Sequence, residues 1–189
     1  MTGRPRDEKV DQAILAATRE VLGEVGYARL TMDAVAARAG AGKAALYRRY
    51  ATKQEMVFAA AVHGLDLELP PDTGALASDL RALVGDIVSS LTGPATHAAV
   101  PGLLADLGAD PALAARFHQT FVARQQDVVA GVLRRAVERG ELDREPEVGF
   151  AQALLVGPVF LWVFMLNRPE RDSFVRDLGD RVAAALLTA

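Results

Sequence analysis

The sequence predicts an all-α chain of about nine helices. Its 189 residues are 51% hydrophobic and only 6% aromatic, and much of the apolar content is alanine and leucine. This balance is typical of helical proteins. Apolar residues recur at intervals of three and four along most of the chain, whereas no stretch shows the strict alternation of a half-buried strand. Glycine and proline separate the periodic segments, so most helices have a recognisable end.

Four helices are predicted before the Pro70-Pro71 pair, over about 7–24, 32–40, 43–50 and from 53 to 63 or further. Gly26 ends the first of them. Thr31 is placed to cap the second, and Asp33 lies where the helix dipole favours an acid. Residues 52–55, Thr-Lys-Gln-Glu, form a capping box that opens the fourth. We expect these four helices to make one compact unit.

Five further helices are predicted beyond the prolines, over about 76–91, 102–107, 111–139, 146–166 and 169–185. Gly93-Pro94 closes the first of these, Asp110-Pro111 starts the third, and Gly140 stops it. The stretch around residues 96–108 is less regular than its neighbours, so only a short helix is expected within it.

The composition argues against catalysis. The chain has no cysteine, which excludes disulfides, thiolate metal ligands and thiol nucleophiles. Its three histidines lack the spacing of a metal site, and no nucleophile elbow or phosphate loop is present. We therefore expect no metal, no cofactor and no enzyme. The lack of cysteine, and of an apolar segment at the N-terminus, suits a cytoplasmic protein.

Charge is unevenly divided along the chain. Residues 1–55 carry 10 lysines and arginines against 7 acidic residues, a net charge of +3, whereas residues 56–189 carry 11 against 17, a net charge of −6. The first part can approach a polyanion, and the second part should stay away from it. Within the first part, GRPR at residues 3–6 is either an arm that reaches a DNA minor groove or a disordered tail.

The second and third predicted helices have the layout of a helix-turn-helix. Ala36 is small where the two helices cross, Gly40 can adopt the left-handed turn, and Leu46 can anchor the second of the pair. Helices of about two turns do not persist alone, so the first and fourth helices must hold this pair in place.

The third predicted helix has two different faces, because positions four apart lie together. Leu46 and Tyr50 are expected to face the core. The outward face then consists of Lys43, Ala44, Tyr47 and Arg48. Cations and free amides near a helix N-terminus attract phosphate, and alanine lets the backbone approach base edges. Alone, such a cluster could be a solvated surface, but the turn, the anchors and the capping box in register favour binding to the major groove of DNA.

The stretch TMDAVAARAGAGKAALYRRYATKQE, residues 31–55, resembles the DNA-binding signature of the TetR family of bacterial transcriptional regulators. The resemblance implies a helix-turn-helix DNA-binding domain over residues 1–55 and a ligand-binding and dimerisation domain over residues 56–189. The fourth helix, about 53–68, would link the two domains. Beyond the signature only the number and length of the helices match.

Seven positions match DNA-contacting positions of the family. They are Thr31 and Tyr47 as phosphate contacts, Lys43, Ala44, Ala45 and Arg48 on the recognition helix, and Lys53 at the start of the fourth helix. The family often has serine where Gly42 stands and glycine where Ala44 stands. A phosphate contact from position 42 is therefore not expected, and some specificity should come from DNA shape.

The predicted dimer surface lies near the C-terminus. A helix-turn-helix protein that reads two half-sites of a palindromic operator needs a two-fold dimer. The helix around residues 150–166 is apolar on every side, so one protomer can hardly cover it. The predicted interface residues are Phe150, Leu154, Gly157, Leu161, Phe174, Leu178 and Val182. The alternatives are a helix in the centre of a monomer core and a membrane segment, which Gln152 and Gly157-Pro158 disfavour.

The helices between residues 75 and 139 are expected to enclose a pocket for a small apolar or aromatic effector. The candidate lining residues are Leu83, Ile87, Leu103, Phe117, Phe121, Gln125 and Trp162, each of which also suits an ordinary core. Taken together, the sequence predicts a cytoplasmic, homodimeric transcriptional repressor; its release from the operator by a small molecule follows from the resemblance alone. The alternative is a helical sensor or adaptor that acts through protein partners without binding DNA.

Overall fold

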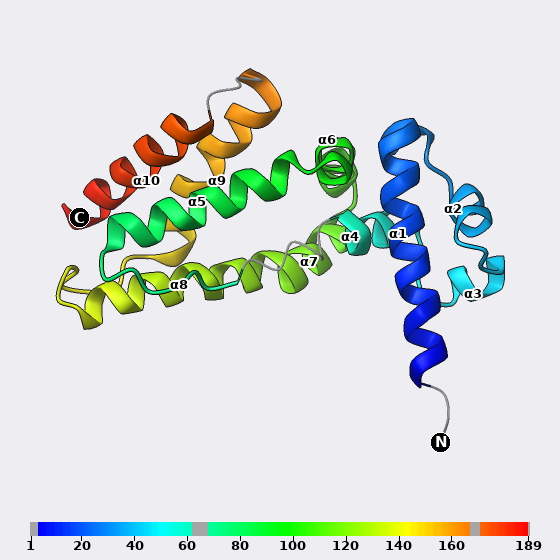
Figure 1. Ribbon diagram of the computed structural model, residues 1–189, viewed down its shortest axis with the longest axis horizontal. Coiled ribbons are helices and arrows are strands. Elements are labelled where there is room, and N and C mark those ends of the chain that lie inside the picture. The colour runs from blue at the N-terminus through cyan, green and yellow to red at the C-terminus, as the bar shows by residue number, and fades with distance from the viewer. Residues whose placement is uncertain (1–3, 62–67, 167–170, 189) are drawn as a thin grey trace. The chain divides into compact units, whose positions relative to one another are not determined.

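The computed structural model describes residues 4–61, 68–166 and 171–188, and within these ranges all regular structure is helical (Figure 1). Packing divides the chain into two compact units. Unit 1 comprises Met1–Leu65 and Gly93–Arg116, and unit 2 comprises Asp66–Thr92 and Phe117–Ala189. When helices that continue without a break are counted together, the described ranges hold nine helices, as the sequence predicts.

The first four helices of unit 1 are α1 (Arg4–Arg29), α2 (Met32–Arg38), α3 (Lys43–Tyr47) and α4 (Lys53–Ala61). Gly26 interrupts α1 with a φ of 74°, where the sequence predicts its end. One half of the predicted capping box is present, because the Thr52 hydroxyl accepts from the Glu55 amide at 3.1 Å. The Glu55 carboxylate accepts at 2.9 Å from the amide of Ala51, one residue before the Thr52 amide that the motif predicts. Figure 1 shows α2 and α3 on the same flank of α1. The predicted continuation of α4 beyond residue 61 lies outside the described ranges.

The start of α1 differs from the prediction. The backbone is helical from Arg4, whereas the sequence predicts a start near Asp7 that leaves residues 3–6 as an arm or tail. Pro5 is compatible with a first helical turn, because the amide that it lacks has no partner inside the helix at that position. Residue 3 itself lies outside the described ranges.

Helix α6 (Pro94–Ala109) also differs from the prediction, and it packs in unit 1. A helix is present over 102–107 as expected, but it is longer than predicted: it begins at Pro94 and continues through Pro101. A proline inside a helix removes one amide hydrogen bond, so the local sequence argues against a helix that continues through Pro101. Long-range packing favours the helix instead: a Cβ at Gly102 would lie 2.1 Å from Tyr27 Cδ1, so the tyrosine ring of α1 rests directly on the α6 backbone.

The remaining elements are α5 (Leu76–Thr92), α7 (Pro111–Phe117), η1 (His118–Val122), α8 (Ala123–Glu138), α9 (Val148–Leu161), η2 (Trp162–Leu166) and α10 (Arg171–Leu187). The π-helical turn η1 joins α7 to α8, so the long helix predicted between Asp110 and Gly140 is present. The Asp110 carboxylate caps it by accepting from the amides of Ala112 at 2.9 Å and Leu113 at 3.0 Å. The sequence does not predict η1 or η2.

The core of unit 2 is one cluster of aliphatic side chains from α5, α8, α9 and α10. Fully buried members include Leu80, Leu83, Leu133 and Leu155. Helix α10 lies close against α5, because a Cβ at Gly179 would lie 2.9 Å from the Arg81 backbone. An ion pair of 2.5 Å between Arg81 and Asp180 reinforces this contact at the surface.

Only one side of α9 is buried in that core. Ala151, Leu155 and Val159 are buried, whereas Phe150 and Leu161 are 59% and 45% exposed. By length and composition, Val148–Leu166 could cross a membrane, but core helices of water-soluble proteins meet the same criteria. The exposed side is an apolar surface of the kind that marks an interaction site.

A buried carboxylate joins the start of α5 to the end of α8. Asp79 is fully buried, and its Oδ1 accepts from the Thr73 amide at 2.9 Å and from the Thr73 hydroxyl at 2.5 Å. Its Oδ2 accepts from Arg139 Nη2 at 3.1 Å. Arg139 also donates to Asp72 at 2.6 Å and to Glu141 at 2.7 Å. Burial raises the pKa of the Asp79 carboxyl, but the hydrogen bonds from Thr73 and Arg139 outweigh it and lower the pKa overall.

We predict that Asp79→Asn lowers the free energy of unfolding at pH 7 by about 1 to 3 kcal/mol, because the substitution removes one partner of a buried, charge-assisted network. The folded-state pKa of Asp79 lies below its unfolded value of about 3.9. Its stabilising effect is therefore complete above about pH 4 and is lost as the pH falls through the folded-state pKa. Urea unfolding at several pH values should show wild type and variant converging in acid.

Asp86→Asn on the same helix is the matched control. Burial alone raises the pKa of Asp86, so its charge opposes folding at pH 7 and its removal should be neutral or slightly stabilising. An Asp79→Asn variant as stable as wild type at pH 7 would show that the network contributes nothing.

Candidate nucleic-acid interface

The α2–α3 pair has the geometry of a helix-turn-helix. Thr31 is the N-cap of α2, and its hydroxyl accepts from the Ala34 amide at 3.2 Å. Gly40 adopts a φ of +61° in the turn, a conformation that a residue with a Cβ rarely takes. Gly42 is the N-cap of α3 and has no side chain to bond the free amides. Thr31 and Gly40 thus have the backbone roles that the sequence predicts for them.

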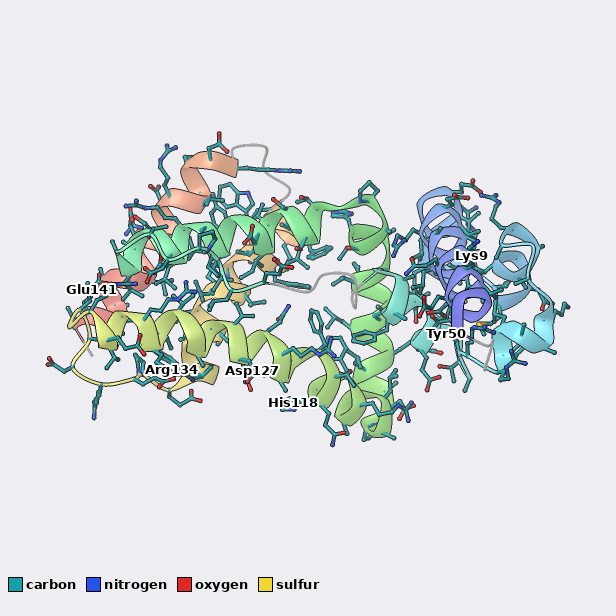
Figure 2. All side chains as sticks on the ribbon, turned by 60° about the horizontal axis from the view of Figure 1, so that its bottom comes forward. Lys9, Tyr50, His118, Asp127, Arg134 and Glu141 are labelled. Atoms are coloured by element: carbon teal, nitrogen blue, oxygen red, sulfur yellow. The ribbon has the colours of Figure 1, made fainter. Side chains whose placement is uncertain are left out.

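One side of α3 is fixed to the rest of unit 1. Leu46 is fully buried. Tyr50 lies on the turn that follows α3 (Figure 2). Its hydroxyl donates to Asp11 of α1 at 2.9 Å. Arg49 Nε lies 3.9 Å from the same carboxylate. Burial and the bond to Asp11 both raise the pKa of the Tyr50 phenol, so it remains a neutral donor at physiological pH. Leu46 and Tyr50 therefore face inward, as predicted.

The opposite side of α3 is open to solvent. Tyr47 is 50% exposed, and Lys43, Ala44 and Arg48 are exposed as well. Thr31 at the start of α2 is exposed, and Ala45 is half-buried between the two faces. We call the surface formed by Thr31, Lys43, Ala44, Tyr47 and Arg48 the recognition face.

A carboxylate that the sequence pattern does not connect with this face lies beside it. Lys43 Nζ is 2.6 Å from Asp33 Oδ2, and both side chains are more than half exposed. This hydrogen bond raises the pKa of the Lys43 ammonium, which is charged in any case. The sequence assigns Asp33 only to the helix dipole, because the contact joins residues ten apart on two helices. This ion pair directs the Lys43 side chain of α3 toward Asp33 of α2.

Lys53, the remaining predicted contact, is half-buried at the start of α4. Its Nζ lies 4.2 Å from the centroid of the Tyr27 ring, over the face of the ring. At the other end of α1, a shallow hollow of about 330 Å³ is lined by Glu8, Asp11, Arg48 and Arg49. Because it contains both signs of charge, the hollow is not a simple phosphate site.

The predicted effector residues are divided between the units. Leu103 lies on α6 in unit 1, and the other six lie in unit 2. Leu83 and Ile87 belong to the unit 2 core. The rings of Phe117 and Phe121 are 5.2 Å apart, Gln125 accepts from Gln152 at 3.4 Å, and Trp162 stacks on Phe174 at 4.1 Å. In the described ranges, no group of three or more histidine or acidic side chains could hold a metal ion.

The predicted dimer residues fall into three groups. Phe150, Gly157 and Leu161 are exposed on α9. Leu154, Phe174 and Leu178 are half-buried and pack against the unit 2 core. Val182 is almost completely buried inside that core, so it is not available to a partner. Helical periodicity identifies an apolar face but not whether its own chain covers it, which explains the placement of Val182.

Comparison with protein families decides how this geometry is to be understood. A family model described as "Bacterial regulatory proteins, tetR family" matches residues 14–60, and one described as "Tetracyclin repressor-like, C-terminal domain" matches residues 70–182. The chain belongs to the TetR family of bacterial transcriptional regulators. Members of the family are DNA-binding regulators rather than enzymes, so the functional class predicted from the recognition-helix sequence is confirmed.

Relatives of this TetR-family chain match it along nearly its whole length. An uncharacterized HTH-type transcriptional regulator of Mycobacterium tuberculosis is 36% identical, over 93% of this chain and 86% of the relative. A DNA-binding transcriptional repressor of Mycobacteroides abscessus is 32% identical, over 96% of each chain. The crystal structure of a TetR family transcription regulator with 26% identity has a TM-score of 0.72 and covers 93% of this chain and 97% of that chain.

Proposed function

We propose that the recognition face enters the major groove of an operator and that α3 is the recognition helix. One observation carries this proposal: α3 buries Leu46 and exposes Lys43, Ala44, Tyr47 and Arg48 on its other side. Lys43 and Arg48 supply cations for phosphate or guanine, and Tyr47 and Thr31 supply hydroxyl donors for phosphate. Ala44 and the half-buried Ala45 leave room for the backbone to approach base edges. Lys53, at the start of α4, adds a contact with the DNA phosphate backbone.

The protein then reads a palindromic site as a two-fold dimer, because one short recognition helix covers only one half-site. We place the dimer surface on the open side of α9, around Phe150, Gly157 and Leu161, with the half-buried Leu154, Phe174 and Leu178 at its edge. Further exposed apolar side chains on Met165 and Leu166 extend this surface. In this proposal a second copy of the chain, rather than lipid, buries the exposed apolar surface of α9, because a regulator that binds an operator works in the cytoplasm.

We also propose that the protein is a repressor that a small apolar or aromatic effector releases from DNA. The relative from Mycobacteroides abscessus is named a repressor. Unit 2 contains aromatic surface in the Phe117–Phe121 pair and the Trp162–Phe174 stack, and polar groups in the Gln125–Gln152 amide pair. Apolar surface with a few polar groups is the chemistry of a small-molecule site. A ligand that prefers one conformation of the dimer shifts the population away from the DNA-competent state.

Lys43→Ala and Tyr47→Ala should each weaken binding by about 1 to 3 kcal/mol without unfolding the protein, because each removes a contact made from an exposed position. The probe is a duplex selected from a random DNA pool with the wild-type protein. Fluorescence anisotropy over a salt series should also show a shallower salt dependence for Lys43→Ala. Arg134→Ala, an exposed arginine on α8 (Figure 2), is the matched control and should bind as wild type. Unchanged binding by both variants would refute the recognition face and favour an adaptor without DNA binding.

Leu161→Glu should weaken dimerisation by about tenfold or more, because it places a charge in an apolar contact. Sedimentation velocity at several protein concentrations measures the effect. Leu104→Glu is the matched control, since Leu104 is 43% exposed on α6, outside the proposed surface. A Leu161→Glu protein that dimerises as tightly as wild type would move the interface elsewhere.

Small uncharged aromatic compounds that release the selected duplex should also change the emission of Trp162, the only tryptophan in the chain. Phe121→Ala should weaken that response by at least about fivefold, because it removes buried apolar contact with the ligand. Tyr47→Ala, which changes only the recognition face, should bind the compound normally. If a compound releases DNA but changes the Trp162 emission of Phe121→Ala and of wild type equally, the effector site lies elsewhere.

A further inference from the structure

Three helices of unit 1 meet around one tyrosine. Tyr27 stands just after the break at Gly26, near the end of α1. The Lys53 ammonium of α4 lies over its ring, 4.2 Å from the centroid. The Tyr27 hydroxyl donates to Asp106 Oδ2 of α6. Gln54, the neighbour of Lys53 on α4, donates to the same oxygen at 2.9 Å.

The ring has little freedom to move. A Cβ at Gly102 would lie 2.1 Å from one ring carbon of Tyr27 and 2.7 Å from two others, so the ring lies flat on the α6 backbone where only glycine fits. The hydroxyl is fixed at its far end by Asp106, which is half-buried. Helix α6 thus holds the ring at two places, four residues apart on one face of the helix.

The fixed Tyr27 ring restricts the side chain of Lys53, which could otherwise sample many rotamers. A lysine ammonium is attracted to the electron-rich face of an aromatic ring. Donation of the phenol hydrogen to a carboxylate polarises the ring toward greater negative charge and strengthens that attraction. Restricting the long side chain before DNA arrives lowers the entropy that is lost when the ammonium contacts a phosphate.

We propose that Tyr27 and Asp106 are positioning residues for Lys53, so that a carboxylate on α6 sets the strength of a DNA-backbone contact made from α4. This inference rests on the proposed DNA contact of Lys53. It adds that a residue outside the helix-turn-helix signature, on a helix that packs against α1 and α4, controls part of the operator affinity. Both residues act through Lys53 and do not touch DNA themselves.

The test is a set of double-mutant cycles with the full-length protein and the duplex selected from a random pool. Tyr27→Leu removes the ring and should weaken binding about two- to fivefold in the wild-type background. Asp106→Asn keeps the size of the side chain and should weaken binding about twofold. Neither substitution should weaken binding further when Lys53→Ala is already present, because the contact that they position is gone.

Tyr50→Phe is the matched control. It removes another tyrosine–aspartate hydrogen bond of unit 1, the one between Tyr50 and Asp11, which does not involve Lys53. Its effect on binding should be the same with and without Lys53→Ala. Thermal unfolding of every variant verifies that the protein is folded. If Tyr27→Leu does not fold, Tyr27→Phe takes its place; it keeps the ring, removes the hydrogen bond to Asp106 and should behave as Asp106→Asn does.

Two results would overturn the inference. If Tyr27→Leu and Asp106→Asn weaken binding equally in both backgrounds, the cluster has only a structural role. If Lys53→Ala binds as wild type while Lys43→Ala and Tyr47→Ala are weakened, Lys53 is no DNA contact, and the proposed function stands without this inference. Wild-type binding by Lys43→Ala and Tyr47→Ala would instead show that the proposed function itself is wrong.

Discussion

The burial of Leu46 is the constraint on which the rest of the structure depends. Helix α3 spans only Lys43–Tyr47, which is too short to keep a fixed direction in water by its own hydrogen bonds. A fully buried leucine on one side determines which side faces solvent, and Tyr50 and Arg49 beside Asp11 fix the rotation of the helix about that anchor. The recognition face is therefore a consequence of what α3 buries.

The other contacts of unit 1 also help to hold α2 and α3 in this orientation. Thr31 and Gly40 set the two ends of α2, and Arg38 of α2 forms a two-pronged ion pair with Glu24 of α1 at 2.8 and 2.7 Å. Exposed pairs of this kind add little free energy, so apolar burial supplies most of the stability and the polar contacts define the geometry. The contribution of α6 is different, because its Asp106 and Gly102 contact Tyr27 of α1 and Gln54 of α4, and the effect that we propose for them on DNA binding is through Lys53.

Local signals predict the parts of the fold that local physics determines. Thr31, Thr52 and Asp110 accept from the amides that their spacing predicts, and Leu46 and Tyr50 face inward as helical periodicity requires. The predicted length of α6 is wrong because Pro101 is a local signal, whereas the packing of Gly102 on Tyr27 joins residues far apart in the chain. The same reason explains why the Lys43–Asp33 pair and the burial of Val182 could not be predicted: each depends on how helices meet, which periodicity does not encode.

Hydrogen–deuterium exchange of the dimer with and without its selected duplex tests the central claim most directly. If the face opposite Leu46 meets DNA, amides of residues 31–34 and 42–48 should exchange more slowly in the complex than in the free protein. Those of the α9 surface should be unaffected. Protection confined to unit 2, with α3 exchanging equally fast in both states, would contradict the account.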